Sequence, residues 1–298
     1  MFVKDLTEKK IMQENIKKVL LIGNGIARCF NSSSWFEIIE DIAKEHKVDY
    51  KEIEKLYPPS QIVVASNNDL ENVAKDIADK LIDKVDNKIC NNNFCNSNCL
   101  LNTILSKRFD SILTTNYSNE LERCFMHKNI LSKVSKKYTM PNLPEKKKRF
   151  QLYRYSCLGN NKVWHIHGDD KVPKSIIADT SYYCKLVAQI EEVLSKLIRR
   201  THAKNFEYKT WVDYFVLGEV HILGFGLDFS EIDIWYILDY KNRKFGNCKT
   251  IYHCPSGKIG LSKEKELLLK TYGVYIEDSV ALENSDYLKY YLDVLNCI

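Results

Sequence analysis

Short apolar runs alternate along this chain with longer stretches in which apolar residues recur at helical spacing. Residues 18–22 read KVLLI, a nearly all-apolar run that fits a strand buried on both faces. Glycines follow this run at once, and residues 34–43 and 69–85 then gather apolar side chains on one face of a helix. The pattern predicts strands and helices in turn along most of the sequence.

The same pattern gives the expected elements further along. We expect strands at 18–22, in the run that ends at Thr114-Thr115, at 220–223, at 250–253 and at 273–276, and a β-hairpin over 151–168 with its turn at 159–161. We expect helices at about 34–43, 69–85, 99–107, 119–126, 180–201 and 262–269, and from about 230 and 282 onward. Residues 61–65 fit a strand or the start of a helix, residues 1–16 a helical or frayed lead-in, and the Lys-rich residues 128–150 an irregular excursion.

Alternating strands and helices indicate an α/β fold with a mostly parallel sheet flanked by helices. The segment 128–205 interrupts the alternation. We therefore expect a single domain over residues 1–298, with a core at about 15–127 and 206–298 and an inserted smaller lobe at about 128–205.

Composition and charge exclude some classes of function. With 45% hydrophobic and 28% charged residues the chain is typical of a globular protein, and its net charge of +5 is too mild to indicate direct nucleic-acid binding. No run approaches the ~18 apolar residues of a membrane span, and the charged N-terminus lacks an apolar signal core. We expect a cytoplasmic protein without membrane contact, whose ten cysteines are reduced thiols.

Three of the cysteines, Cys90, Cys95 and Cys99, lie in an Asn-rich segment. With a fourth ligand from elsewhere they could bind zinc, but the paired Cys-x-x-Cys spacing of such sites is absent. A flexible loop with reduced thiols is the alternative, and we expect no metal.

Two strands end in polar side chains that a strand does not need. One runs into Thr115 and Asn116, and the other into His165, Ile166 and His167, followed by glycine. Since ligands of α/β proteins lie at strand ends, an amide and an imidazole there indicate chemistry on a small molecule. Helix capping is the alternative for Asn116. Alternation puts His165 and His167 on the same strand face, which would also suit a metal, although no partner set has matching spacing.

Glycines follow two of the predicted strands. Gly23-Asn24-Gly25 would let a pyrophosphate approach the backbone, although the full G-x-G-x-x-G pattern fails at Arg28. A bare tight turn is the alternative. Gly224-Phe225-Gly226-Leu227 opens a helix with an acidic start, where Glu231 or Asp233 either binds ribose hydroxyls or only favours the helix dipole.

In this order the motifs resemble a known family. GNG at 23–25, TTN at 114–116, HIHG at 165–168 and GFGL at 224–227, preceded by WVDYF at 211–215, look like the sirtuin-type NAD-binding fold. Over roughly residues 15–295 the chain is similar to the bacterial sirtuin-like effectors of antiphage defence. The resemblance implies a Rossmann-like, mostly parallel sheet flanked by helices, with an inserted smaller lobe.

The resemblance also implies roles for matching positions. Asn116 and His167 correspond to the family's catalytic Asn and His. Together with the candidates above, the residues expected to contact NAD are Gly23, Asn24, Gly25, Arg28, Thr115, Gly224, Gly226, Leu227, Glu231 and His253.

The chain departs from the protein-deacylating sirtuins. Their four-Cys zinc module after the catalytic His is missing, their Asp two residues after the catalytic Asn is Ser118 here, and residues 29–35 replace their Pro-Asp-Phe-Arg stretch. We therefore expect no zinc ribbon and, in place of deacylation, hydrolysis of NAD to nicotinamide and ADP-ribose. A deacylase, an ADP-ribosyltransferase and a non-catalytic nucleotide-binding subunit are the alternatives. A dehydrogenase would need a complete dinucleotide fingerprint.

This hypothesis gives NAD as the substrate, with Asn116 orienting a water or the ribose hydroxyls. His167 is the expected general base, with an unperturbed pKa of about 6.5 that suits neutral pH. Unrestrained NAD loss would kill the cell, so the resemblance implies gating during phage infection (abortive infection). We expect a homo-oligomer, a separate sensor or activator subunit, or both, and inactivity of the chain alone.

Overall fold

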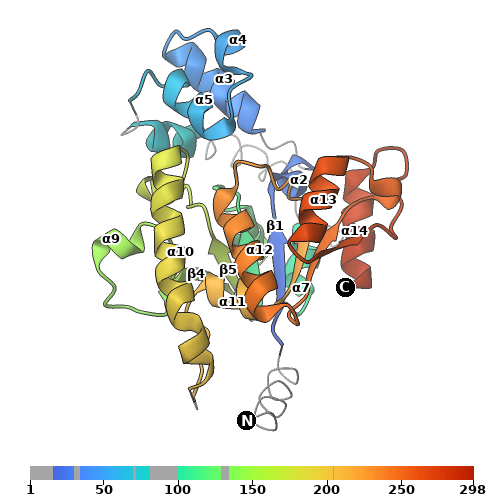
Figure 1. Ribbon diagram of the computed structural model, residues 1–298. Helices are drawn as coiled ribbons and strands as arrows, with labels where there is room; N and C mark the ends of the chain where they lie inside the picture. The colour runs from blue at the N-terminus through green and yellow to red at the C-terminus, as the bar shows by residue number, and fades with distance from the viewer. Residues whose placement is uncertain (1–15, 30–33, 70–71, 81–99, 129–133, 204) are drawn as a thin grey trace.

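The computed structural model describes residues 16–29, 34–69, 72–80, 100–128, 134–203 and 205–298. These residues form an α/β fold with one 8-stranded sheet, in the order β3-β4-β5-β2-β1-β6-β7-β8. Helices cover both faces of the sheet, and a group of short helices stands beyond one end of it (Figure 1). The prediction of a mostly parallel, Rossmann-like α/β fold is confirmed.

The strands are β1 (Lys18–Ile22), β2 (Ser111–Thr114), β3 (Ser135–Tyr138), β4 (Arg154–Leu158), β5 (Asn161–His165), β6 (Glu219–Leu223), β7 (Thr250–His253) and β8 (Val274–Glu277). β5, β2, β1, β6, β7 and β8 are parallel neighbours, and β4 and β3 add an antiparallel edge beside β5. Among the parallel strands alone, the spatial order is third, second, first, fourth, fifth and sixth, as in doubly wound dinucleotide-binding sheets.

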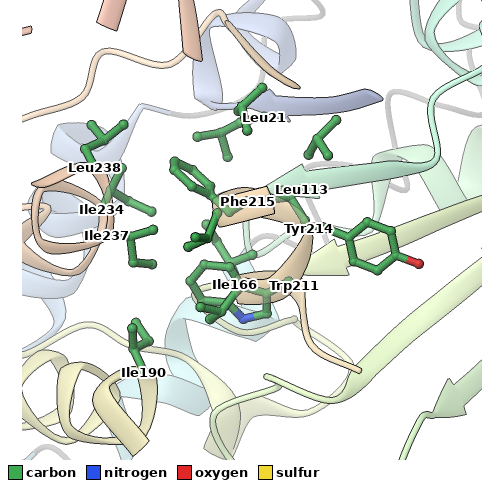
Figure 2. Packing of buried hydrophobic residues seen from close by; sticks show 14 of the residues in the cluster. Leu21, Leu113, Ile166, Ile190, Trp211, Tyr214, Phe215, Ile234, Ile237 and Leu238 are labelled. Carbon is green, nitrogen blue, oxygen red and sulfur yellow. The ribbon is translucent and has the colours of Figure 1, made fainter. Parts of the chain in front are cut away.

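One face of the sheet packs against α10 (Thr180–Thr201), α11 (Trp211–Leu217), α12 (Ile232–Phe245) and α13 (Lys263–Thr271). Side chains alternate along each strand, and Leu21 and Leu113 point to this face. Figure 2 shows them beside Trp211 and Phe215 of α11 and Ile234 of α12. Every residue of α11 is buried, so its sequence carries no amphipathic pattern.

The opposite face packs against α2 (Asn24–Arg28), α7 (Leu100–Ser106), α8 (Glu120–Lys128) and α14 (Tyr287–Cys297). Leu20, Ile22 and Ile112 point to this face. Both faces are therefore buried, which explains the almost wholly apolar strands in the sequence.

A separate apolar cluster joins α3 (Trp35–Glu45), α4 (Tyr50–Ile53), α5 (Pro58–Ala65) and a helix at residues 72–80. We call this group the cap; it lies at the top of Figure 1. α3 begins with a capping box, in which the Ser34 hydroxyl accepts from the Glu37 amide and the Glu37 carboxylate accepts from the Ser34 amide. Ile176 and Ala178, from the segment after β5, pack into the cap.

Most expected elements are present, and α10 has the bounds predicted for it. Residues 58–65 are helical, which decides between the alternatives for 61–65. The expectation of an irregular segment at 128–150 is wrong, because β3 and α9 (Glu145–Lys148) lie there. A charged side chain ties β3 to neighbouring segments. The Lys136 ammonium donates to Asp169 at 2.7 Å and to Asn119 at 3.0 Å.

The expected division into a core and an inserted lobe stays a prediction. Within residues 128–205, β3, β4 and β5 belong to the same sheet as the core strands. Residues 1–15, the cysteines Cys90, Cys95 and Cys99, and the end of the helix expected at 69–85 lie outside the described residues. In the part of the chain that the structure describes, no helix has both the length and the apolar character needed to cross a membrane.

Candidate functional site

The chain reverses its winding direction between β1 and β6, the first and fourth parallel strands, which are direct neighbours in the sheet. In such sheets, ligands bind outside the carboxyl ends of the strands at this point. Both glycine turns predicted from the sequence lie there. The Gly25 amide donates to the Gly224 carbonyl at 2.7 Å, and the Gly23 amide donates to the Leu223 carbonyl at 3.4 Å.

A cavity of about 1020 Å³ opens at this edge of the sheet, a volume that can hold a dinucleotide. It is bordered by both glycine turns, the ends of β2 and β7, the segment after β5, α3 and α5 of the cap, and the start of α14. The predicted site residues that line it are Asn24, Gly25, Arg28, Thr115, Asn116, His167, Gly224, Gly226, Leu227, Glu231 and His253. Of the predicted set, Gly23 does not line it.

Close approach of two backbones requires the glycines of these turns. A Cβ on Gly23 would lie 2.7 Å from Phe225 Cα, and a Cβ on Gly25 would lie 2.6 Å from the Gly224 carbonyl oxygen. Gly224 itself has a φ of 62°, in the left-handed region that favours glycine. Gly226 differs, because a Cβ there would meet no atom within 4 Å. Gly23 therefore supports the cavity wall from behind, without touching the space inside.

Asn116 extends from the end of β2 toward the first glycine turn. Its Nδ2 donates to the Gly23 carbonyl at 3.4 Å, and its backbone amide donates to Thr114 Oγ1 at 3.1 Å. The residue is half-buried and lines the cavity. This contact favours a role in the cavity over the alternative of capping α8.

His167 follows the end of β5 and is 2% exposed. Its Nε2 lies 2.9 Å from Asp233 Oδ2, and its Nδ1 lies 3.6 Å from Glu231 Oε2. The Tyr183 hydroxyl donates to Glu231 Oε2 at 3.1 Å, and the Tyr183 ring packs edge-on against the imidazole with centroids 5.5 Å apart. Gly168, with a φ of 106°, lets the backbone turn tightly just after His167.

The two carboxylates change the acid–base properties of His167. Burial lowers its pKa, but Asp233 and Glu231 together outweigh burial and raise the pKa to about 9. The expectation of an unperturbed pKa is therefore wrong, because a ring with a pKa of about 9 is an imidazolium at neutral pH. Burial raises the pKa of Glu231 to about 7; the charge of His167 opposes this effect and that of Asp233 adds to it.

The acidic residues at the start of α12, Glu231 and Asp233, face groups at the cavity. Glu231 is the N-cap residue of α12, yet its side chain makes no capping hydrogen bond and is directed to Tyr183 and His167. Asp233 is fully buried and does not line the cavity, so the alternative in which it binds ribose hydroxyls is wrong. Its carboxylate faces His167 instead.

The two histidines at the end of the hairpin, His165 and His167, lie on different sides of the sheet. β5 ends at His165 and the chain turns before His167, so strand alternation does not extend to it. His165 Nε2 lies 3.0 Å from Glu122 Oε1 of α8, whereas His167 contacts α12. The prediction of a shared face is wrong, and with it the arrangement in which both histidines bind one metal.

His253, at the end of β7, lines the cavity and stacks on His221 of β6 with ring centroids 5.3 Å apart. His253 Nε2 and His221 Nδ1 are 3.0 Å apart, and His221 Nε2 lies 3.2 Å from Glu219 Oε1. Burial and His221 lower the pKa of His253 to about 4. This imidazole is therefore neutral at pH 7 and offers a ligand hydrogen bonds without charge.

Among the described residues, His167, Glu231 and Asp233 are the group that could hold a cation, since their ligand atoms lie within 4.8 Å of one another. The imidazolium of His167 already brings a positive charge between these two carboxylates. Sequence reasoning misses Tyr183, which reads as an apolar position of the amphipathic α10. It also misses the link from Asp233 to His167, because 66 positions separate the two residues in the chain.

Comparison with protein-family models finds none that matches this chain. Comparison with curated proteins finds no match either. The geometry of the cavity therefore carries the functional conclusion.

Proposed function

We propose that this protein cleaves the bond between nicotinamide and ribose in NAD, giving nicotinamide and ADP-ribose. The observation that carries the proposal is that Asn116 and His167 line one cavity beside two closely packed glycine turns. A cavity of this size at the reversal point of such a sheet fits a dinucleotide. The resemblance of the ordered motifs to sirtuin-type sequences supports the same substrate.

The reaction requires orientation and electrostatics more than covalent chemistry from the protein. The bond to nicotinamide breaks through an oxocarbenium-like state, so the site must hold NAD, stabilise positive charge on the ribose and supply a water. In this proposal Asn116 orients the ribose hydroxyls or the water with its amide. His167, Glu231 and Asp233 together carry one net negative charge when both carboxylates are ionised, which favours a positive transition state.

Two observations favour hydrolysis over the alternatives. The sequence lacks the four-Cys zinc module that helps to form the acyl-lysine groove of deacylating sirtuins. A nucleotide-binding subunit without catalysis would need the glycine turns but not the buried pair of His167 and Asp233. Burying such a pair costs desolvation energy, and perturbed groups of this kind cluster at active sites.

The proposal includes gating, because unrestrained NAD loss would be lethal to a cell. The gate is homo-oligomerisation, a separate activator subunit that responds to phage infection, or both. NAD depletion in the cytoplasm then ends the infection together with the cell.

The test is to incubate the purified chain with NAD, alone and with the products of neighbouring genes, and to separate the products by chromatography. Nicotinamide and ADP-ribose in equal amounts support hydrolysis, and a modified protein in place of ADP-ribose indicates a transferase. Calorimetry that detects no NAD binding, together with no NAD loss in any mixture, refutes the proposal.

Two variants test the assigned residues. Asn116→Ala and His167→Gln are expected to abolish NAD loss and to keep the circular dichroism spectrum of the parent. Glutamine is chosen at position 167 because it can still donate a hydrogen bond to the buried Asp233. Full NAD hydrolysis by both variants would show that other residues perform the reaction.

A further inference from the structure

We propose that Glu231 is a further catalytic residue of this site: its carboxylate takes the proton of the attacking water, while His167 and Asp233 hold it from behind. This inference rests on the proposed function, since it names the group that acts on the water in that reaction. It replaces the expectation that the His167 ring is itself the base.

The first argument is that both nitrogens of the His167 ring face carboxylates. Nε2 lies 2.9 Å from Asp233 Oδ2, and Nδ1 lies 3.6 Å from Glu231 Oε2. A ring between two carboxylates carries a proton on each nitrogen and has no lone pair left to accept another. A water in the cavity therefore finds no acceptor on this ring.

The second argument is that exposure to the cavity increases from Asp233 through His167 to Glu231. The side chain of Asp233 is 0% exposed, that of His167 is 2% exposed and that of Glu231 is 18% exposed. Glu231 and His167 line the cavity, and Asp233 does not. Glu231 is therefore the outermost carboxylate of the three groups, and a water can reach it.

The third argument is that one oxygen of Glu231 is held and the other is open. The Tyr183 hydroxyl and the His167 ring both contact Oε2, at 3.1 Å and 3.6 Å. Among the described residues, none makes a hydrogen bond or an ion pair with Oε1. The carboxylate is thus fixed through one oxygen and presents the other to a water or a ribose hydroxyl.

The reaction step balances with these groups alone. The bond between C1′ of the ribose and the nicotinamide nitrogen breaks, and its electron pair stays on that nitrogen, so nicotinamide leaves neutral. The water oxygen bonds to C1′, and one proton of the water passes to Glu231 and from there to solvent. NAD and water become nicotinamide, ADP-ribose and a proton. The carboxylate also stabilises the positive charge that develops on the ribose.

The step requires ionised Glu231, so its surroundings define the pH dependence. The charged or titratable groups that face it are His167 after β5, Asp233 of α12, Asp228 in the loop before α12, Tyr183 of α10 and Tyr117. Activity is expected to rise as pH increases through about 7, where Glu231 loses its proton. It is expected to remain level until His167 loses its own proton at about pH 9.

The experiment compares wild type, Glu231→Gln and the control Asp239→Asn in the NAD assay described above, from pH 5.5 to 9. Asp239 lies on the same helix and pairs with Arg243 at the surface. Glu231→Gln is expected to lower kcat by about 10²–10⁴-fold, to change KM by only a few-fold and to lose the rise of activity near pH 7. Asp239→Asn is expected to keep the wild-type profile.

A second variant keeps the test decisive if Glu231→Gln does not fold. Tyr183→Phe removes the hydrogen bond that lowers the pKa of Glu231, so the rise of activity is expected to move to higher pH. An unchanged kcat and pH profile in Glu231→Gln, or an unchanged profile in Tyr183→Phe, overturns the role of Glu231 and leaves NAD hydrolysis standing. A wild-type protein that neither binds nor consumes NAD overturns the proposed function instead.

Discussion

The imidazole of His165 donates a hydrogen bond to the backbone carbonyl of Asn116, with 2.9 Å between Nδ1 and the oxygen. Its other nitrogen lies 3.0 Å from Glu122 Oε1. Because a carbonyl and a carboxylate both accept, the ring carries two protons and is charged. A buried ion pair thus fixes the peptide of the proposed catalytic Asn116 from the side away from the cavity.

This pair gives a first prediction, on stability. Replacement of His165 by Leu removes the nearer cation of the buried Glu122 carboxylate and leaves only the Lys136 ammonium, 4.0 Å away. We expect the free energy of unfolding to fall by about 3–5 kcal/mol. Urea denaturation at pH 5.5 measures it. The double variant His165→Leu/Glu122→Leu is expected to be more stable than the single variant. A loss below about 1 kcal/mol in the single variant would contradict the charge pair.

The choice of pH follows from the pKa shifts of the pair. Burial lowers the pKa of His165, but the Glu122 carboxylate outweighs burial and raises the pKa from 6.5 to about 9. The stability that the charged imidazole contributes is therefore complete below pH 6.5 and is lost as pH rises through 9. Burial raises the pKa of Glu122, but His165, Lys136 and Ser156 together outweigh burial and lower the pKa from 4.5 to about 2. The stability that the ionised carboxylate contributes is therefore lost as pH falls from 4.5 through 2. Between pH 4.5 and 6.5 the ion pair makes its full contribution to the free energy of unfolding.

A second prediction concerns the charge on His167. Asp233→Asn removes the nearer of the two carboxylates that raise the pKa of this ring. We expect the pKa of His167 to fall below 9, because burial then meets less opposition. The imidazole carbon protons, followed by NMR as a function of pH, report the change. Asp239→Asn serves as the control. An equal pKa of His167 in both variants would show that Asp233 does not raise this pKa.

A third prediction separates two glycines of the cavity wall. Gly25→Ala puts a methyl group 2.6 Å from the Gly224 carbonyl oxygen, so the two turns must move apart. We expect a loss of about 1–3 kcal/mol in unfolding free energy and at least tenfold weaker NAD binding by calorimetry. Gly226→Ala meets no atom within 4 Å and is expected to unfold within about 0.5 kcal/mol of wild type. Equal unfolding free energies for the two variants would contradict the close packing.

A fourth prediction concerns acid stability through His253. Its pKa is about 4 in the folded protein and 6.5 without burial, so the unfolded chain binds the proton first as pH falls. Stability is therefore lost between pH 6.5 and 4, by up to about 3 kcal/mol. His253→Gln is expected to lose less stability than wild type between pH 7 and 4.5 in urea denaturation. Parallel losses in the two proteins would count against a neutral stacked imidazole.

A fifth prediction concerns the buried side-chain amine of Lys241 on α12, whose pKa burial lowers to about 7. Lys241 is 2% exposed and donates to the carbonyls of Phe215, Gly218 and Lys249 at 2.8–3.0 Å. Lys241→Met leaves these carbonyls without this donor, and we expect a loss of about 2–4 kcal/mol in urea denaturation. Lys244→Met, an exposed position of the same helix, is expected to change stability by less than about 0.5 kcal/mol.

Elements with a strong local signal could be predicted from the sequence. α10 has a capping Asp179 and a long amphipathic repeat, and β1 is a short apolar run closed by glycines, so both were predicted closely. α11 lacked such a signal because burial on all sides removes the polar face by which a helix is recognised. β3 could not be predicted because one of its two inward residues is Lys136, whose partners Asn119 and Asp169 come from other parts of the chain.

At the candidate site, too, local sequence patterns indicate the residues but not their partners. The strand ends at Asn116 and His167 were found because polar residues interrupt apolar runs there. The partners of these residues, His165 for Asn116 and Asp233 for His167, lie 49 and 66 positions away in the sequence, and only the tertiary fold brings them together. Strand alternation failed at His167 because one residue of turn is enough to reverse the side to which a side chain points.

The central position of β1 has a consequence for biosynthesis. β1 pairs with β2 on one side and on the other with β6, from Lys18↔Glu219 to Ile22↔Leu223. A nascent polypeptide therefore exposes one edge of β1 until β6, about 200 positions further along the chain, has been translated. Before that point the cavity lacks the second glycine turn and Glu231. A chain that ends before α12 therefore has no complete site.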